Sequence, residues 1–480
     1  MPLPDNSVPR GRIRRMMPLA GATARAAGGR LVAELREQAG DDGAVERFHE
    51  RTAQRYAELL GHSRGVLMKA GQIFAMIDAH PLGTGGFGHY REALSRLQAD
   101  APPMHPALVR EILETELGGS VEQFAEFAEQ PMAAASIGQV HRAVLRDGRH
   151  VAVKIQYPGV AQAIRDDLAN TELVATLMHF AASASGLMKP DVRPAAREAA
   201  ARIGEEVDYR HEAATIATFS ELYRGHPFIR IPDVVPEAST DRVLTMSYLD
   251  GLDWAEAQQA DQHLKNTWAE TIMRFSFANY RHANLLHADP HPGNYRFNPD
   301  GTVGFVDFGC VKVLPEPQRW RLVAVNRAVI EGRKQDMRDI MTRMGFLTAD
   351  CDLTVDEIYQ WYSTILYEYV SPSQPVTYTH ETTRRVIAGI FDLRDARHPM
   401  ARMNAPDDFV FTGRVQLALA TVCAGLGATA PARAITDDLD GVAEPTTQLG
   451  VHHHTWVRER GLPSALDHHD RHRKPRRTAG

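Results

Sequence analysis

The most constraining feature of the chain is a pair of polar segments built around two aspartates in its second half. Residues 287–294 read His-Ala-Asp-Pro-His-Pro-Gly-Asn and place Asp289 a few positions before Asn294. Asp307 opens Asp-Phe-Gly directly after the apolar run 303–306, which predicts a strand that delivers it. Carboxylate and amide oxygens are the hard ligands that Mg²⁺ prefers. This spacing predicts a rigid loop with a reactive carboxylate at Asp289 and a metal site at Asn294 and Asp307.

A second feature lies upstream, where residues 148–154 read as a turn and a strand that ends at Lys154. A lysine in an alternating strand is, on its own, most often a solvated edge residue. Here it precedes an acidic helix, Asp289 and Asp307, which is the order found in enzymes of the protein-kinase type. In those enzymes the strand lysine contacts the α- and β-phosphates of ATP and pairs with a helix glutamate. The order therefore predicts a kinase-like fold.

The nucleotide would be bound by two further segments. An apolar strand breaks into a polar, glycine-containing turn within residues 242–251, which predicts adenine contacts at Met246 and Tyr248. Before the lysine strand, alanines stand where kinases have glycines that let backbone amides approach phosphate. A stiffer nucleotide loop is expected, and an alanine-rich helix start capped by Ser136 is the alternative. The loop residues assigned to nucleotide binding are Ala133, Ala134, Ala135, Ser136, Ile137, Gly138 and Gln139.

These segments together resemble the UbiB family of atypical kinases, the AarF-like proteins of ubiquinone biosynthesis. The alanine-rich segment matches the family's nucleotide loop, residues 69–72 match its Lys-x-Gly-Gln signature, and residues 206–208 match its Glu-x-Asp signature. The resemblance runs from about Arg10 to about Ala430. It implies an α+β, protein-kinase-like two-lobed fold with extra N-terminal helices packed over the active site.

The resemblance also implies roles for residues outside the two aspartate segments. Lys69 and Gln72 would occlude the active site next to Glu206 and Asp208, where a protein substrate would otherwise dock. Glu212, which follows the Glu-x-Asp signature, is the expected helix acid for the strand lysine.

The implied cofactors are ATP or ADP and Mg²⁺. The implied activity is phosphoryl transfer or ATP hydrolysis that supports isoprenoid quinone assembly at a membrane. The chain departs from the family pattern at Ser247, where an acidic residue is often found. Nucleotide contacts in the adenine-binding segment are mostly made by the backbone, so this difference is expected to have little effect. Many members also end in hydrophobic membrane spans, which are not expected in this sequence.

Composition agrees with a large, two-lobed unit and limits the partners. The chain has 480 residues, of which 44% are hydrophobic and 24% charged, enough for a substantial core. Its net charge of −6 gives no reason to expect a nucleic acid partner. Three cysteines at unrelated spacings predict neither a disulfide framework nor a zinc site, which favours a cytoplasmic location. No apolar run is long enough to cross a bilayer.

Both ends of the chain are basic. Arginines interrupt a small and apolar segment at residues 13–35, which predicts an amphipathic helix on an anionic membrane surface; a frayed, solvated N-terminus is the alternative. The resemblance favours a peripheral location at the inner face of the cell membrane, with isoprenoid quinone precursors or quinone-pathway enzymes as partners. The C-terminal histidines predict incidental metal binding in a disordered tail. The acids predicted to form a linker before that tail are Asp437, Asp438, Asp440 and Glu444.

The expected organisation is one kinase-like unit with additions at both ends. The predicted parts are a basic extension at 1–45, a helical Lys-x-Gly-Gln region at 46–130, an N-lobe at 131–250, a C-lobe at 251–435 and a polar tail at 436–480. Three alternative functions stay open: a conventional protein kinase, a small-molecule phosphotransferase, and a nucleotide-gated lipid-binding scaffold without turnover.

Overall fold

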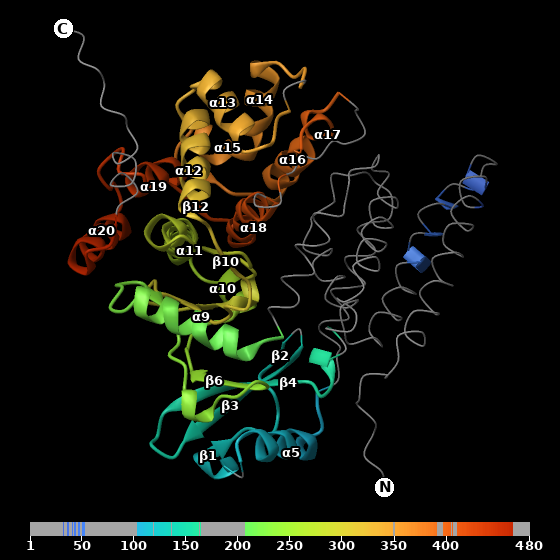
Figure 1. Ribbon diagram of the computed structural model, residues 1–480, viewed down its shortest axis with the longest axis vertical. Coiled ribbons are helices and arrows are strands. Elements are labelled where there is room, and N and C mark those ends of the chain that lie inside the picture. Colours follow the sequence, from blue (N-terminus) through green and yellow to red (C-terminus); the bar gives the residue numbers. More distant parts are fainter. Residues whose placement is uncertain are drawn as a thin grey trace. The chain divides into compact units, whose positions relative to one another are not determined.

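The computed structural model describes residues 103–463, apart from 119, 136, 163, 165–206, 349–350, 391–396, 405 and 407–409, together with scattered positions between 32 and 52. The chain divides into two compact units, whose helices and strands are labelled in Figure 1. Unit 1 contains Met1–Ala214 and Asp233–Tyr248, and unit 2 contains Thr215–Pro232 and Leu249–Gly480.

Unit 1 is built on an antiparallel sheet with the strand order β1-β3-β4-β6, in which β2 also pairs with β3. Along β4, Val151, Val153 and Ile155 are each 0% exposed and line one face of the sheet, while Lys154 and Gln156 on the other face are also buried. Apart from the first residues of helix α9, the described elements of unit 1 are α5 (Pro106–Glu116), η2 (Ser120–Gln123), β1 (Phe124–Phe127), β2 (Ala133–Ala135), β3 (Gly138–Leu145), β4 (His150–Gln156), η3 (Pro236–Ala238) and β6 (Val243–Ser247).

Helix α9 (Tyr209–Leu222) is one continuous helix that crosses the division between the units. Its first turn contains Glu212 and belongs to unit 1, whereas its residues from Thr215 onward belong to unit 2. The helix therefore contributes residues to both units, and Glu212 of the predicted site lies on the unit 1 side of the division.

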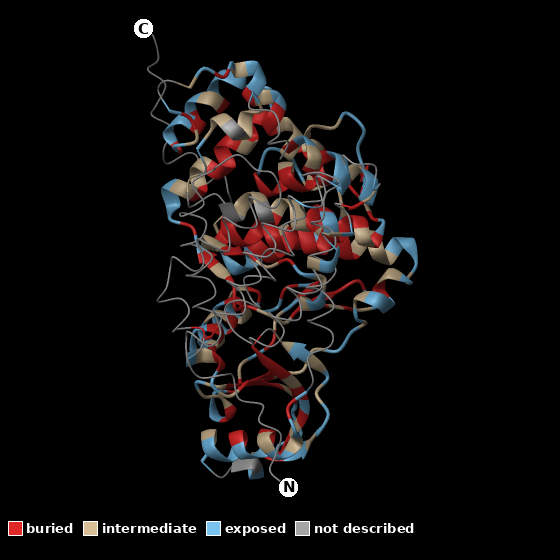
Figure 2. Ribbon diagram, turned by 90° about the vertical axis from the view of Figure 1, so that its right-hand side faces the viewer, coloured by how far each residue is buried: buried red, intermediate tan, exposed pale blue. Residues whose placement is uncertain are grey.

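Unit 2 is organised around the long helix α11 (Gln262–Ala283), in which every residue from Trp268 to His282 is buried; buried residues are red in Figure 2. A helix that is buried on all sides lies at the centre of a domain. Asp261 caps its start, and Asn284, in the left-handed conformation with φ 56°, ends it and turns the chain into the next strand.

Short strands and a shell of helices complete unit 2. Strand β10 (Val311–Val313) pairs with β7 (Leu285–His287), β9 (Val303–Phe305) lies between β5 (Ile229–Arg230) and β8 (Tyr295–Phe297), and β11 (Val376–Thr377) pairs with β12 (Thr429–Ala430). The helices are α10 (Trp254–Gln258), η4 (Pro292–Asn294), α12 (Glu316–Ile330), α13 (Lys334–Arg343), α14 (Val355–Ile365), α15 (Tyr367–Val370), α16 (His380–Ile390), α17 (Pro399–Arg402), α18 (Val410–Leu426), α19 (Ala432–Leu439) and α20 (Gln448–Arg460).

The α+β class predicted from the sequence is confirmed by this combination of an antiparallel sheet with a mainly helical second unit. Within the described residues, no helix combines the length and the apolar character needed to cross a membrane. The predicted N-terminal extension and the Lys-x-Gly-Gln signature lie largely outside the described residues. Apart from a few positions between 47 and 52, the described part of the predicted region 46–130 begins at residue 103 and contains α5, η2 and β1.

The prediction of a polar, disordered tail from residue 436 is wrong as far as residue 463. Helices α19 and α20 occupy this part of the chain, and His453 and Trp456 of α20 are 0% and 4% exposed. The predicted linker acids Asp438 and Asp440 are each 1% exposed because they pair with buried arginines of α11. The prediction was wrong because charged and imidazole side chains are usually exposed to solvent. Here they are buried against partners that are distant along the chain, which a local sequence pattern does not reveal.

Candidate functional site

Lys154 and Glu212 form the ion pair that the sequence predicted. The lysine Nζ lies 2.8 Å from one carboxylate oxygen of Glu212 and 2.9 Å from the other. Lys154 is held in the central strand β4, opposite Val140 of β3 and Leu244 of β6, and its Nζ lies 5.3 Å from the centroid of the Tyr209 ring. Their predicted contact is confirmed, and their role toward nucleotide phosphates stays a prediction.

The pair is almost completely removed from solvent, since Lys154 is 8% and Glu212 1% exposed. Removing two charges from water costs several kcal/mol per ion (about 20 in the idealised limit), and a buried pair often stabilises a fold no better than apolar side chains. An ion pair kept at this position is therefore poorly explained by stability alone. A lysine that holds a compact charge against a carboxylate is suited to bind a phosphate oxygen.

The alanine-rich segment is a β-hairpin, which excludes the alternative of a helix start. Ala133, Ala134 and Ala135 pair with Val140, Gln139 and Gly138 across β2 and β3. Ser136 lies outside the described residues. At Gly138 a side chain is impossible without movement, because a Cβ there would lie 2.2 Å from the backbone oxygen of Ile155. The hairpin therefore packs closely against β4, the strand that carries Lys154.

Gln139 has a structural role that the sequence did not indicate. Its side chain is 1% exposed, accepts the N–H of Met104 at 2.8 Å and contacts His141 Nε2 at 2.7 Å. His141 Nδ1 in turn lies 2.8 Å from the carbonyl oxygen of Ala128, and burial lowers the pKa of this histidine. The Gln139 side chain therefore connects the hairpin to the preceding chain by hydrogen bonds. The predicted nucleotide contacts would be made by the other residues of the loop.

The predicted adenine-binding segment lies at the end of β6, whose Met246 pairs with Ala152 of β4. Met246 is 4% exposed. The backbone N–H of Tyr248 donates to the carbonyl of His150 at 3.0 Å, and the Tyr248 ring lies 4.6 Å below the Arg142 guanidinium carbon. The Tyr248 amide is therefore engaged within the sheet, so an adenine contact at this segment would use its other backbone groups.

In unit 2, the predicted catalytic and metal-binding side chains Asp289 and Asn294 are in direct contact. The Asn294 amide nitrogen donates to Asp289 Oδ2 at 3.2 Å and to the Asp289 carbonyl at 3.3 Å. Because the amide nitrogen faces Asp289, the amide oxygen points the other way and is suited to bind a cation. Both residues are partly exposed, in contrast to the buried strand before them.

Asp307 is brought beside this loop by the pairing of β7 with β10, in which His287 faces Val311. The backbone N–H of Val306 donates to the carbonyl of Asn294 at 3.0 Å. Asp307 Oδ1 accepts the Gly309 N–H at 3.0 Å, which fixes the orientation of the carboxylate. The two segments that the sequence singled out therefore lie side by side, as the predicted metal site requires.

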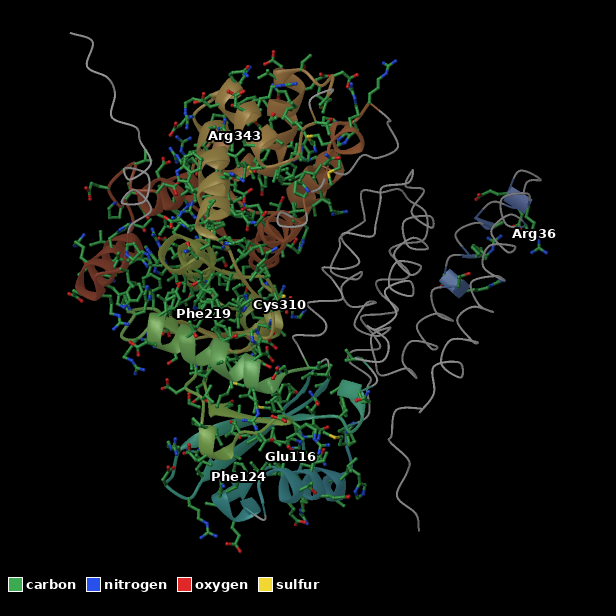
Figure 3. The ribbon with its side chains drawn as sticks, viewed as in Figure 1. Arg36, Glu116, Phe124, Phe219, Cys310 and Arg343 are labelled. Atoms are coloured by element: carbon green, nitrogen blue, oxygen red, sulfur yellow. The ribbon has the colours of Figure 1, made fainter. Side chains whose placement is uncertain are left out.

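His287 is a positioning residue that sequence reasoning quoted but assigned no role. Its Nε2 lies 2.7 Å from the carbonyl oxygen of Asp307, and its ring meets Phe308 edge-on at a centroid distance of 5.4 Å. Phe308, 0% exposed, packs 4.8 Å from Phe219 of α9, which is labelled in Figure 3. An aromatic cluster thus joins the Asp-Phe-Gly turn to the helix that carries Glu212. The only sequence signal for it is the apolar spacing along α9.

The predicted occluding residues Lys69, Gln72 and Glu206 lie outside the described residues. Asp208 is exposed, and its Oδ1 accepts the backbone N–H groups of Arg210 and His211, each at 3.0 Å. This is the contact of a helix N-cap. Asp208 therefore starts α9 a single turn before Glu212, whatever further contact it makes.

The donor set in unit 2 fits Mg²⁺ as the sequence predicted. Asp307 supplies a carboxylate and Asn294 an amide oxygen, and Mg²⁺ usually takes one or two protein ligands beside water and substrate phosphates. Among the described residues, no cluster of three or more histidine, cysteine or acidic side chains is arranged to hold a metal by itself. A site of this kind would be completed by the phosphates of a nucleotide.

Comparison with known proteins places this geometry in a family. The ABC1 atypical kinase-like domain matches residues 96–341. The chain is 28% identical over 473 residues to atypical kinase COQ8B, mitochondrial, from Rattus norvegicus, covering 96% of this chain and 84% of that protein. It is 29% identical to atypical kinase COQ8, mitochondrial, from Saccharomyces cerevisiae, covering 72% of this chain and 68% of the relative.

A solved structure shows the same fold. It is described as the complex structure of Rv3197–erythromycin from Mycobacterium tuberculosis, and it is 31% identical in sequence with a TM-score of 0.57. The match covers 85% of this chain and 97% of that chain. The kinase-like fold predicted from the sequence is therefore confirmed, and the chain belongs to the ABC1 atypical kinase-like family, which is the UbiB family.

Proposed function

We propose that the protein binds Mg-ATP and either hydrolyses it or transfers its phosphoryl group to a small acceptor, in support of isoprenoid quinone biosynthesis or lipid handling at a membrane. The observation that carries the proposal is the buried Lys154–Glu212 pair, with 2.8 Å between Nζ and Oε1. Such a pair has a clear use once a phosphate is present, because the ammonium group then neutralises a second anion.

The chain's own residues would divide the chemistry as follows. Lys154, oriented by Glu212, binds the α- and β-phosphates, and Asp307 with Asn294 supplies oxygen ligands to the metal ion. Asp289, oriented by the Asn294 amide, accepts a hydrogen bond from the attacking hydroxyl or water. The metal ion, when bound, neutralises charge that develops on the transferred phosphoryl group.

A short connection after Asp-Phe-Gly supports hydrolysis or transfer to a small acceptor over protein phosphorylation. In protein kinases a long activation segment follows this tripeptide and carries the regulatory phosphosite. Here Gly309 is followed almost at once by β10, which pairs with β7, and then by α12 beginning at Glu316. Occlusion by Lys69 and Gln72 would act in the same direction and remains part of the proposal.

The membrane part of the proposal rests on the basic segment 13–35 and on the family resemblance. Arginines of such a segment would bind anionic lipid headgroups, so the protein would be peripheral at the inner face of the membrane. Isoprenoid quinone precursors, or the enzymes that process them, would be its partners there.

The decisive experiment measures Mg²⁺-dependent ATP hydrolysis by the full-length protein, with and without anionic liposomes. Asp307→Asn should abolish activity, whereas Asp339→Asn, which removes an exposed carboxylate on α13, should leave it unchanged. Activity that rises with liposomes supports a membrane-responsive enzyme. Nucleotide binding without turnover in either condition would contradict the enzymatic function and favour a nucleotide-gated lipid-binding scaffold.

A second candidate ligand comes from the solved relative described as a complex with erythromycin, whose chain is covered to 97% by this match. We propose it as an alternative ligand class, a macrolide, for this chain. Calorimetric titration of the protein with erythromycin, in the presence and absence of ADP, tests it. Absence of heat at millimolar macrolide rules this ligand out and leaves the nucleotide proposal intact.

A further inference from the structure

One face of the sheet in unit 1 carries Lys154, and strand pairing determines which other side chains share that face. Residues opposite each other in adjacent strands project to the same side, and side chains alternate between the two sides along each strand. Lys154 is opposite Val140 of β3, and Ala152, two residues earlier on β4, is opposite Arg142. Arg142 therefore projects from the same face as Lys154, two residues further along the sheet.

A tyrosine from the next strand reaches the same place. Met246 of β6 is opposite Ala152, and Tyr248 follows Met246 by two positions. Because the Tyr248 N–H still donates to the carbonyl of His150 of β4, the strand geometry continues to Tyr248, whose side chain shares the face of Met246. The Arg142 guanidinium carbon lies 4.6 Å from the centroid of the Tyr248 ring. The two side chains come from the strands on either side of β4 and meet across it.

The two faces of the sheet differ in exposure. On the opposite face, the two valines of β4 are each 0% exposed and belong to the core. On the face of Lys154, Ala152 and Tyr248 are partly exposed and Arg142 is exposed. This end of the lysine-bearing face is therefore accessible to a ligand.

Arg142 carries a charge that the described part of the chain does not neutralise. Among the described residues, no acidic side chain forms an ion pair with Arg142, although two arginines in the turn of the same β3–β4 hairpin have such partners. A cation over an aromatic ring at an exposed position contributes little to stability. Arginine guanidinium groups and tyrosine rings are, however, the side chains on which nucleobases stack.

The spacing along the sheet fits a nucleotide that is bound by its phosphates at Lys154. Two residues of an extended strand span about 7 Å, so the row formed by Arg142, Ala152 and Met246 lies about that far from the lysine row. The ribose of a nucleotide separates its base from its phosphates and can bridge two such rows. Ala152, with a single methyl group, leaves its row accessible to a flat ring.

The other direction along β4 is closed to a base. Gln156, which follows Lys154 on the same face, is 1% exposed and donates to the carbonyl of Val207 at 3.1 Å. A nucleotide with its phosphates at Lys154 can therefore extend its base only toward Arg142 and Tyr248 on this face.

We propose that Arg142 and Tyr248 form the outer wall of the nucleotide site in unit 1, and that the base of the bound nucleotide stacks against this pair. The inference rests on the proposed function, since it takes the phosphates to bind at Lys154, and it deepens that function by assigning residues to the base. Stacking uses the π-face of the base. ATP and ADP should therefore gain equally from the pair, and a polyphosphate without a base should gain nothing.

Removal of the guanidinium separates a base contact from a general effect of charge. Calorimetric titration of the full-length protein measures the affinities for Mg-ATP, Mg-ADP and Mg-tripolyphosphate, which lacks both base and ribose. Arg142→Ala should weaken ATP and ADP by about tenfold each, within the range of one base stack, and leave tripolyphosphate unchanged. Because Arg142 is exposed, the variant should fold normally, which circular dichroism verifies.

Two further arginine variants serve as controls. Arg146→Ala removes another exposed cation of the β3–β4 hairpin and should leave all three affinities unchanged. Arg142→Lys retains the charge but offers no planar surface, so it should recover only a small part of the lost ATP affinity.

Substitutions of the tyrosine test whether the two side chains act as a pair. Tyr248→Phe keeps the ring and should bind ATP as the wild type does, whereas Tyr248→Leu should weaken ATP severalfold. Adding Arg142→Ala to Tyr248→Leu should cost less than Arg142→Ala costs alone, because the effects of residues in contact are not additive.

The outcomes distinguish this inference from the proposed function. Wild-type ATP affinity in Arg142→Ala, an equal loss for tripolyphosphate, or full recovery in Arg142→Lys would overturn the inference and leave the proposed function intact. Absence of ATP and ADP binding to the wild type would overturn the proposed function, on which the inference rests.

Discussion

Buried charge is used differently in the two units, and the residue types differ accordingly. In unit 1 the buried cation of the predicted site is a lysine, Lys154, paired with Glu212. In the described part of unit 2 the most deeply buried cations are arginines, such as Arg274 and Arg281, at 0% and 2% exposure, whereas Lys312 of β10 is 9% exposed. A lysine is a compact charge that exchanges partners readily, whereas the planar guanidinium fixes a set of partners in place.

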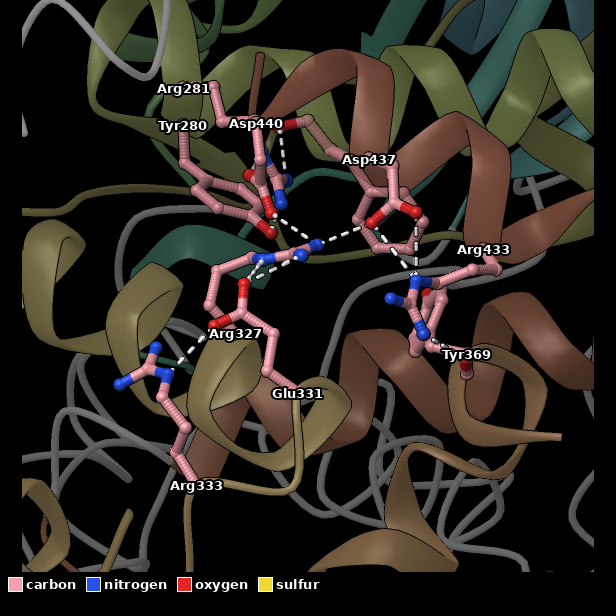
Figure 4. Close-up of polar contacts among 10 residues, drawn as sticks. Tyr280, Arg281, Arg327, Glu331, Arg333, Tyr369, Arg433, Asp437 and Asp440 are labelled. Carbon is pink, nitrogen blue, oxygen red and sulfur yellow. Dashed lines mark hydrogen bonds and ion pairs between the residues drawn. The ribbon is translucent and has the colours of Figure 1, made fainter. Parts of the chain in front are cut away.

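The arginines of unit 2 join helices rather than form a site. Arg281 of α11 donates to Asp440 of the α19–α20 connection at 2.8 Å, while Arg327 of α12 contacts both Asp437 and Asp440 (Figure 4). Arg433 of α19 shares Asp437 at the edge of the same network, as Figure 4 shows. The comparison suggests that the arginines carry structure and the lysine carries function.

The largest effect on stability is expected from the removal of one buried arginine. Arg274→Leu should lower the free energy of unfolding by about 3–5 kcal/mol, because Asp438 is left buried without its main partner. Urea denaturation measures the loss. Arg433→Leu is the matched control at the exposed edge of the network and should cost about 1 kcal/mol or less. Equal losses in the two variants would contradict a structural role concentrated in the buried arginines.

The buried arginines and the buried histidines of unit 2 differ in how they make stability depend on pH. The arginines stay protonated at every pH at which the protein is folded, whereas a histidine such as His282 in the last turn of α11 can change its charge. Burial lowers the folded-state pKa of His282 to about 4, whereas the unfolded chain titrates near about 6.5. The unfolded state therefore takes up the proton first, and stability present above about pH 6.5 is lost as the pH falls toward about 4. The expected loss is of order 3 kcal/mol at the lower limit.

Denaturation by urea at several pH values tests this expectation. His282→Gln should flatten the pH dependence, while His263→Gln, at an exposed position near the start of the same helix α11, should leave it unchanged. An equal slope in wild type and His282→Gln would show that another group controls the acid sensitivity.

Replacing Lys154 and Glu212 together tests whether this ion pair contributes to function rather than to stability. The double variant Lys154→Met with Glu212→Gln leaves no unpaired charge, so its stability should stay within about 1 kcal/mol of the wild type. Its ATP hydrolysis should nevertheless fall by about 100-fold, since a preorganised charge on the phosphates is gone. Chemical denaturation and an ATPase assay, run on the same sample, give the two numbers. A large loss of stability with normal turnover would reverse the assignment.

The smallest expected effect concerns the alanine hairpin. Ala134→Gly should loosen β2 against β3, because glycine has greater backbone freedom in a strand. ATP and ADP affinities should then change unequally, by about two- to fivefold, as expected of a surface strand that is weakened by less than about 1 kcal/mol. Fluorescent nucleotide titration measures both. Unaltered affinities for both nucleotides would count against a role of this hairpin at the phosphates.

Sequence reasoning was most successful where the relevant residues lie close together along the chain. The spacing of Asp289 and Asn294 predicted that both lie on one loop, and in the structure their side chains are in contact. The strand predicted before Asp307 is also present. The pairing of Lys154 with Glu212 spans 58 positions, and the family resemblance rather than any local pattern identified the acid. These predictions concern a motif whose chemistry fixes both residue type and order.

The elements that sequence reasoning missed depend on contacts between distant positions. His226 and His453 are 227 positions apart, and nothing near either residue indicates the other. Asp438 and Trp456 belong to segments whose composition is typical of exposed chain. Periodicity reports which face of an element is apolar, but it does not report a polar side chain that is buried because its partner arrives from elsewhere.

The paired acids of α19 and the following turn have a consequence for how the chain can be divided. A protein ended at residue 435, the predicted end of the C-lobe, would keep Arg274 and Arg281 inside α11 while Asp438 and Asp440 were lost. Arg281 would then lose its paired carboxylate and Arg274 would keep only Glu270, which would oppose the folding of the helix that precedes the predicted catalytic loop. We therefore expect a fragment of unit 2 that folds by itself to extend at least through α19 and the turn that contains Asp440.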